Sequence, residues 1–127
     1  MFRIDTKEQI DLNTVLEPGV YRIFWIKNNI PQVIHRIGGN DESGLLYIGK
    51  TEVTLQDRLN QFRCTAFINS TNHSGALKYR LNVRLNELIN DDELFAEIYP
   101  CENSPQIEIE ELNNYKNRYG EVPPLNG

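Results

Sequence analysis

The sequence lacks any long apolar run and has only two cysteines, and both features narrow the class of protein. No segment approaches the roughly 20 apolar residues of a membrane-spanning helix, and Met1–Asp5 lacks the apolar stretch of a signal peptide. We therefore expect a cytoplasmic protein without a membrane segment. Cys64 and Cys101 stand far apart, with no Cys-x-x-Cys or His-x-x-x-His spacing beside them. This arrangement argues against a zinc site and for reduced, buried thiols.

Excess positive charge is absent as well, because the formal net charge is −5. The charge is unevenly distributed. Residues 50–84 carry six Lys or Arg against two Asp or Glu, whereas residues 85–127 carry two against ten. Proteins that bind nucleic acid normally show a basic surface, so the middle segment is the candidate for a phosphate-binding surface. A solvated charged face of two helices explains the same charges equally well.

The composition and the first half of the chain predict a single globular domain that begins with strands. The chain has 127 residues, of which 39% are apolar and 24% charged, as is ordinary for one domain spanning residues 1–127. Val20–Ile26 is rich in β-branched and aromatic residues and reads as a strand. Gln32–Ile37 is a second candidate strand, Gly38–Gly44 has loop composition, and Leu45–Gly49 predicts a short buried strand.

The middle of the chain predicts two helices. Thr54–Asp57 resembles a capping box, and the apolar residues that follow recur at helical spacing, so we expect a helix over Leu55–Arg63. Residues 64–75 form an irregular link. Leucines repeat every three or four residues from Leu77 to Leu88, which predicts one longer helix.

The last third predicts a strand, a helix and an extended end. Glu93–Tyr99 reads as a strand that stops at Pro100. Ser104 and Pro105 have the form of an N-cap followed by a first-turn proline, opening a helix that reaches Tyr119 before Gly120 ends it. We expect 122–126 to be extended.

Two tyrosines in the predicted strands each have a glycine two residues away, in Gly19-Val20-Tyr21 and Tyr47-Ile48-Gly49. A strand tyrosine more often packs against its cross-strand neighbours than takes part in catalysis. A neighbouring glycine, however, permits close backbone approach. A phenol titrates near about 10, so a tyrosine that acts as a base at neutral pH needs a nearby cation. Lys50 would supply that charge; alternatively it is a solvated lysine at a strand end.

Arg58 falls at the edge of the apolar stripe of its predicted helix. That position suits an arginine whose stem is packed while its guanidinium binds a phosphate oxygen. The alternative is a surface arginine. His73 stands at the entrance of the next predicted helix, where it could accept or relay a proton. His35, in a strand-like segment without companion ligands, is assigned no role.

Glu108 lies between Leu112, Tyr115 and Tyr119 on the apolar face of the last predicted helix. An ionised carboxylate in an apolar face is costly unless it is paired or bound to a metal. Glu108 is therefore the candidate ligand for a hard cation, which prefers carboxylate oxygens. A salt bridge to a neighbouring element is the alternative. Glu111, at the edge of the same face, remains a fallback ligand.

The order of these motifs resembles the GIY-YIG endonuclease superfamily over roughly Pro18 to Asn126. The residues that carry the resemblance are, in chain order, Gly19-Val20-Tyr21, Leu46-Tyr47-Ile48-Gly49-Lys50-Thr51, Arg58-Leu59, Asn72-His73-Ser74, and Glu108 with Leu112 and Tyr115. The resemblance implies an α/β fold with a small central, mainly antiparallel sheet flanked by helices.

The resemblance also implies an activity and roles for these residues. The activity is hydrolysis of DNA phosphodiester bonds with one divalent metal, Mg²⁺ or Mn²⁺. Glu108 would bind the metal and Arg58 would steady the scissile phosphate. Proton and charge handling would fall to Tyr21, Tyr47, Lys50 and His73, and either tyrosine would deprotonate the attacking water. Asn126 would close the site by hydrogen bonds to backbone near the tyrosines.

Two features leave alternatives open. The connection between the tyrosine motifs contains an additional excursion, Pro31–Gly44, which is either a specificity element or a longer hairpin. The chain leaves almost no room for a separate DNA-binding segment, so selectivity is expected from this excursion, from a homodimer or from a partner protein. The competing interpretation is a non-catalytic module that binds nucleic acid or protein and keeps the fold.

Overall fold

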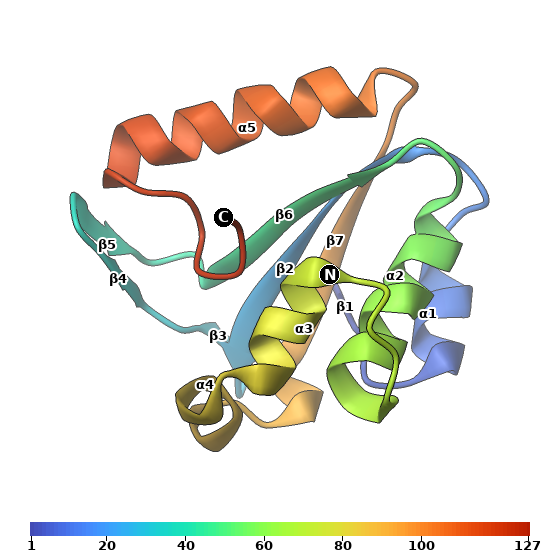
Figure 1. Ribbon diagram of the computed structural model, residues 1–127, viewed down its shortest axis with the longest axis horizontal. Helices are drawn as coiled ribbons and strands as arrows, with labels where there is room; N and C mark the ends of the chain where they lie inside the picture. The colour runs from blue at the N-terminus through green and yellow to red at the C-terminus, as the bar shows by residue number, and fades with distance from the viewer.

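The computed structural model describes residues 1–127, which form one α/β domain with an antiparallel sheet between helices (Figure 1). The helices are α1 (Lys7–Asn13), α2 (Leu55–Arg63), α3 (Ser74–Leu81), α4 (Val83–Leu88) and α5 (Ser104–Tyr119). The strands are β1 (Phe2–Arg3), β2 (Gly19–Lys27), β3 (Ile30–Pro31), β4 (Ile34–Arg36), β5 (Gly39–Asp41), β6 (Leu45–Thr51) and β7 (Leu94–Pro100). None of these helices is both long and apolar enough to cross a lipid bilayer.

Strand β2 is the centre of the main sheet. It pairs with β7 along one side, and on the other side with β6 and, at its far end, with β3. β1 extends the sheet beyond β7, and β4 and β5 form a separate two-stranded hairpin. All of these pairings are antiparallel. Strand β6 therefore has a partner strand on one side and leaves its other edge to non-strand segments.

Each face of the sheet carries its own apolar core, because side chains alternate between faces along a strand. Tyr21, Ile23 and Tyr47 belong to the larger core, which also contains buried residues of α1, α2 and α3. Val20 and Ile48 belong to the smaller core, which contains Tyr115 of α5. Figure 1 shows α5 alone on one side of the sheet and α1, α2 and α3 on the other.

The helix boundaries that rest on local capping chemistry are confirmed. Helix α2 spans Leu55–Arg63 as predicted, and the Thr54 hydroxyl accepts a hydrogen bond from the Asp57 amide at 3.1 Å. Helix α5 spans Ser104–Tyr119, with Gly120 in the left-handed conformation at φ 79° as its C-cap. The N-cap is Asn103 rather than Ser104, whose hydroxyl donates to the Thr51 carbonyl at 3.0 Å.

The predicted long helix over Leu77–Leu88 is wrong, because the chain leaves helical geometry at Asn82. The Asn82 side chain accepts a hydrogen bond from the Leu85 amide at 3.1 Å and caps a second, shorter helix. Asparagine competes in this way with helix continuation. A π-helical turn, Cys64–Ile68, also occupies part of the predicted irregular link.

Further differences lie in the hairpin, at the end of the chain and at the cysteines. Strand β5 lies within the predicted loop Gly38–Gly44, because it pairs with β4. The end of the chain contains a turn instead of running extended, with the Asn126 amide donating to the Pro123 carbonyl at 3.0 Å. Both cysteines are free as expected, but they are half-buried rather than buried.

Asp41 and Tyr115 join the hairpin to α5 through a buried hydrogen bond. The Asp41 side chain is 1% exposed, and the Tyr115 hydroxyl donates to its Oδ2 at 2.8 Å. Its Oδ1 accepts from the amide and the hydroxyl of Ser43, at 2.9 and 2.6 Å. The carboxylate thus has donors on both oxygens, as a buried charge requires.

Tyr115→Phe should lower the free energy of unfolding by about 1–3 kcal/mol, because it leaves a buried carboxylate oxygen without its donor. Urea unfolding measures the change. Tyr99→Phe is the matched control, since Tyr99 is 60% exposed and its hydroxyl makes no hydrogen bond. Equal stability of the two variants would contradict a contribution from this bond.

Candidate active site

The residues singled out in the sequence gather around the edge strand β6. They come from six segments: Tyr21 from β2, Tyr47 and Lys50 from β6, Arg58 from α2, His73 from the start of α3, Glu108 from α5 and Asn126 from the C-terminal tail. In Figure 1, α2 and α3 lie on one side of β6 and α5 lies on the other. The edge of the sheet is therefore the place where side chains from both faces can meet.

The two tyrosines pack closely because two positions beside them have no side chain. The rings of Tyr21 and Tyr47 lie 6.0 Å apart, centroid to centroid. A Cβ atom on Gly49 would lie 2.5 Å from the Tyr21 hydroxyl oxygen and 2.6 Å from Cε2 of Tyr47. A Cβ atom on Gly75 would lie 2.6 Å from Cε1 of Tyr47. Glycine at both positions is required by ring packing, since neither has a positive φ.

His73 is completely buried and joins the tyrosines through its ring. Its Nε2 lies 2.6 Å from the Tyr21 hydroxyl oxygen, and its Nδ1 accepts a hydrogen bond from the Ala76 amide at 3.2 Å. Because an amide N–H occupies Nδ1, the neutral ring carries its proton on Nε2 and donates it to Tyr21. This bonding leaves no free nitrogen lone pair, so His73 acts as a donor to Tyr21 instead of the proton acceptor or relay expected from sequence.

Burial keeps these three groups uncharged. It raises the pKa of both Tyr21 and Tyr47 and, together with the nearby Arg58 charge, lowers the pKa of His73 to about 3. The Arg58 charge opposes the rise at both tyrosines. The sequence predicted that Lys50 would be the cation that favours phenolate, but the cation that opposes the rise in the pKa of both tyrosines is Arg58. Residues three apart in a strand point to opposite faces, so Lys50 cannot face the same side as Tyr47.

Arg58 is held by its own helix and by the loop before α3. Its Nη1 donates to the Gln61 side chain at 2.7 Å and to the Asn72 carbonyl at 3.3 Å. Its other two nitrogens, Nε and Nη2, carry the remaining three N–H donors of the guanidinium, which face no acceptor as close as these. Asn72 belongs to the motif Asn72-His73-Ser74, whereas Gln61 was not singled out in the sequence. Gln61 follows Arg58 by three residues on a predicted helix, the spacing at which side chains meet.

Glu108 is a half-buried carboxylate without a hydrogen bond or an ion pair. Burial raises its pKa, and the charges of Lys50 and Arg58 oppose that rise. Glu108 in turn raises the pKa of Tyr47, after the larger effect of burial. Glu108 thus lies within electrostatic reach of three of the other site residues.

The other glutamates of α5 are placed differently. Glu111, the fallback ligand, forms a two-pronged ion pair with Arg22 of β2, and Arg22 also pairs with Glu97 at 2.9 Å. Glu110 is exposed. Glu108 is therefore the carboxylate of this group that is both without a partner and half-buried near Lys50 and Arg58.

Glu108 fits a hard divalent cation such as Mg²⁺, because it offers a half-buried carboxylate without a protein partner. No group of three or more His, Cys, Asp or Glu side chains gathers anywhere in the structure. A cage made only of protein ligands is thus missing, but Mg²⁺ commonly binds one or two carboxylates and completes its shell with water and substrate phosphate.

Lys50 and Arg58 also line a hollow of about 430 Å³ next to the site. Residues of the loop between β6 and α2 also line it, together with Asp57 and Gln61 of α2. Lys50 makes one exposed contact, to Glu52 at 3.3 Å. The hollow thus contains two cations and two carboxylates, Glu52 and Asp57, and Lys50 and Arg58 are the groups in it that can bind phosphate oxygens.

Asn126 binds the backbone of the strand that carries Tyr47. Its Oδ1 accepts from the Ile48 amide at 2.9 Å, and its Nδ2 donates to the Ile48 carbonyl at 2.8 Å. The Leu125 amide donates to the Leu46 carbonyl at 2.9 Å. Together these bonds satisfy backbone groups on the open edge of β6, where an unpaired edge would otherwise face solvent.

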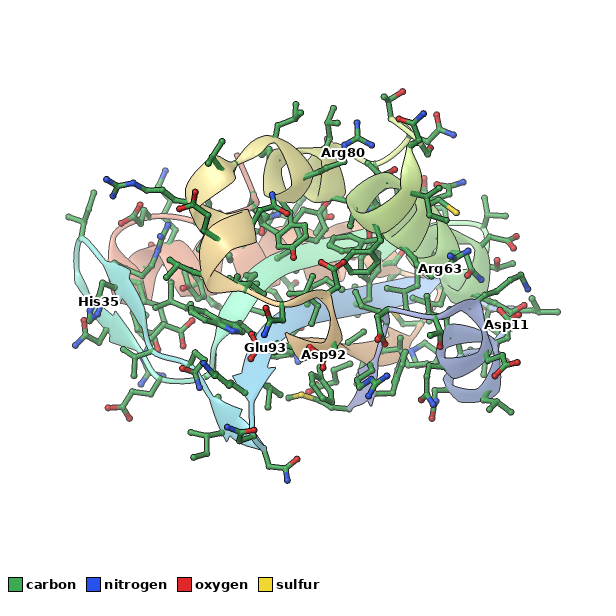
Figure 2. All side chains as sticks on the ribbon, turned by 90° about the horizontal axis from the view of Figure 1, so that it is seen from below. Asp11, His35, Arg63, Arg80, Asp92 and Glu93 are labelled. Carbon is green, nitrogen blue, oxygen red and sulfur yellow. The ribbon has the colours of Figure 1, made fainter.

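His35, to which no role was assigned, lies away from the site. Figure 2 shows it on the β4–β5 hairpin, at the opposite end of the molecule from Arg63 of α2. Its Nδ1 contacts the Asn40 side chain at 2.9 Å, a bond within the hairpin.

Comparison with protein-family models, with curated proteins and with solved structures found no match.

The buried imidazole makes folding sensitive to acid. Folding lowers the pKa of His73 from 6.5 to about 3. Between these two pH values the unfolded chain therefore binds a proton at His73 that the folded protein does not bind. The stabilising contribution is complete above about pH 6.5 and is lost as the pH falls toward 3.

His73→Asn, which keeps an N-cap acceptor, should therefore show a weaker loss of stability between pH 7 and pH 4.5 than wild type. Urea unfolding at both pH values measures the slope. His35→Asn is the control, because His35 is exposed. The same slope in wild type and His73→Asn would contradict a buried, neutral His73.

Proposed function

We propose that this protein is a metal-dependent endonuclease that hydrolyses DNA phosphodiester bonds, with an active site of the GIY-YIG kind. The observation that carries the proposal is the unpaired, half-buried Glu108 beside Arg58 and a buried Tyr–Tyr–His cluster at one edge of the sheet. A structural role alone does not account for a carboxylate left unpaired in such a place.

Each group has a chemical task in hydrolysis. Glu108 would hold a single Mg²⁺ or Mn²⁺, which supplies activation of water and stabilisation of charge on the phosphate. Arg58, fixed through Nη1 by Gln61 and Asn72, directs Nε and Nη2 at a phosphate oxygen. A rigid guanidinium of this kind stabilises developing negative charge without having to reorient.

The tyrosine pair would handle the proton of the attacking water. The Tyr21 oxygen accepts a hydrogen bond from His73 Nε2, and the Arg58 charge favours phenolate at both tyrosines. Tyr47 is the more exposed of the two rings, at 9% against 1% for Tyr21. In this arrangement Tyr47 is the tyrosine nearer to solvent, and Tyr21 is the tyrosine whose hydroxyl is hydrogen-bonded to His73.

DNA is the proposed substrate because free cations lie on the segments beside the site. Lys78 and Arg84 are exposed and make no ion pair, whereas Arg80 is committed to the Thr65 and Ser70 carbonyls. Only a few phosphates can be bound by so few cations, so affinity should be modest and dependent on salt. We therefore also propose that selectivity requires a homodimer or a partner protein, and that the protein acts in the cytoplasm.

Glu108→Gln should reduce nicking of supercoiled plasmid by at least about 100-fold, because it removes the charge of the sole protein ligand to the metal. The assay compares Mg²⁺, Mn²⁺ and chelator, on plasmid and on branched duplexes. Glu110→Gln is the matched control, since Glu110 is exposed on the same helix. Wild-type protein that binds DNA but leaves every substrate intact with either metal would instead favour the non-catalytic binding module.

Arg58→Lys should slow cleavage by about 10- to 100-fold while leaving DNA binding in chelator nearly unchanged, because an ammonium cannot reproduce the two-pronged guanidinium contact. Single-turnover cleavage and filter binding separate the two effects. Arg84→Lys serves as control. If both variants cleave at the wild-type rate, Arg58 does not contact the scissile phosphate.

A further inference from the structure

The β4–β5 hairpin is fastened to the end of α5 and to the residues that follow it. The Gly38 amide, in the turn of the hairpin, donates to the Tyr119 carbonyl at 2.7 Å. A Cβ atom on Gly38 would lie 2.8 Å from the Tyr119 carbonyl carbon, so only glycine permits this approach. With the bond between Tyr115 and Asp41, the hairpin is tied to α5 at two points.

Glu121 forms the centre of the attachment between the hairpin and the C-terminal tail. Its Oε2 accepts a hydrogen bond from the Ile37 amide at 2.7 Å, and its Oε1 pairs with Arg36 Nη2 at 2.9 Å. The Arg36 side chain is only 12% exposed and also donates to the Val122 carbonyl. Glu121 is 31% exposed, so this ion pair is partly shielded from water.

The same tail reaches the candidate active site a few residues later. Leu125 and Asn126 make three hydrogen bonds to the backbone of β6. Pro123 and Pro124 stand between Glu121 and these contacts, and each proline fixes its own φ. A short, stiff connection of this kind transmits a displacement at one end to the other instead of absorbing it.

We propose that Glu121, held by Arg36 of the hairpin, is a positioning residue for the candidate active site. It fixes the tail so that the Asn126 side chain makes its two hydrogen bonds to the backbone of Ile48, the residue between Tyr47 and Gly49. The excursion over residues 31–44 would then stabilise the position of the edge strand β6 through the C-terminal tail. The effect of Glu121 on catalysis rests on the proposed function. Its effect on the contact between the tail and β6, which we call the brace, does not.

Amide hydrogen exchange measured by NMR tests the brace without any assay of activity. In Glu121→Ala, the amides of Ile48 and Leu125 should exchange at least about tenfold faster relative to that of Ile23, a fully buried residue of β2. Glu121→Gln should lie between this variant and wild type, because its amide oxygen still accepts from Ile37. It also keeps the test possible if Glu121→Ala does not fold. Glu87→Ala, which removes an exposed and unpaired carboxylate, should leave all three amides unchanged.

Two outcomes would overturn the proposal. One is exchange at Ile48 and Leu125 that stays as in wild type; the other is exchange that rises in step with Ile23, which would mean general loss of stability. Where wild type cleaves DNA, Glu121→Ala should lower kcat at least about tenfold with little change in KM, as expected for misplaced catalytic groups. Full activity despite local opening would also overturn the positioning role. If wild type cleaves nothing, the proposed function fails while the exchange data still decide the brace.

Discussion

The backbone of strand β6 is the element on which the candidate site depends. On one side it pairs with β2, which sets Tyr21 opposite Gly49 and so brings the two tyrosine motifs together. On its open side, Asn126 and Leu125 replace a neighbouring strand. Because side chains alternate along β6, one short strand directs Tyr47 toward α2 and α3 and Lys50 toward the other side. Groups from both faces of the sheet thereby meet at one edge.

Burial and charge divide this site into two zones. The inner zone contains two phenols and an imidazole, which desolvation keeps neutral and which hold one another by packing and by the Tyr21–His73 hydrogen bond. The outer zone contains Glu108, Arg58 and Lys50, whose charges act on one another at the rim. A neutral inner layer excludes water, so the electrostatic effect of the rim charges is stronger than it would be in bulk solvent.

Pairing decides which of many charged residues are available for function. Glu111 and Arg22 neutralise each other across α5 and β2, and Arg80 supports the π-helical turn through backbone carbonyls. The net charge of −5 therefore says little about the surface near Arg58. What matters there is the small set of cations left unpaired, and its size fits a protein that makes few phosphate contacts by itself.

Local chemistry in the sequence determined much of this protein. The cap at Thr54, the glycine at 120 and the β-branched run after Gly19 fixed α2, the end of α5 and β2, because each signal acts within a few residues. The position of Glu108 on the apolar face of α5 also singled it out. Tertiary structure alone decided the rest. It paired Glu111 with Arg22, oriented the His73 ring as a donor to Tyr21, brought Arg58 close to the tyrosines and tied the hairpin to the tail. Each of these depends on a partner distant in the chain, and helical or strand periodicity carries no information about such partners.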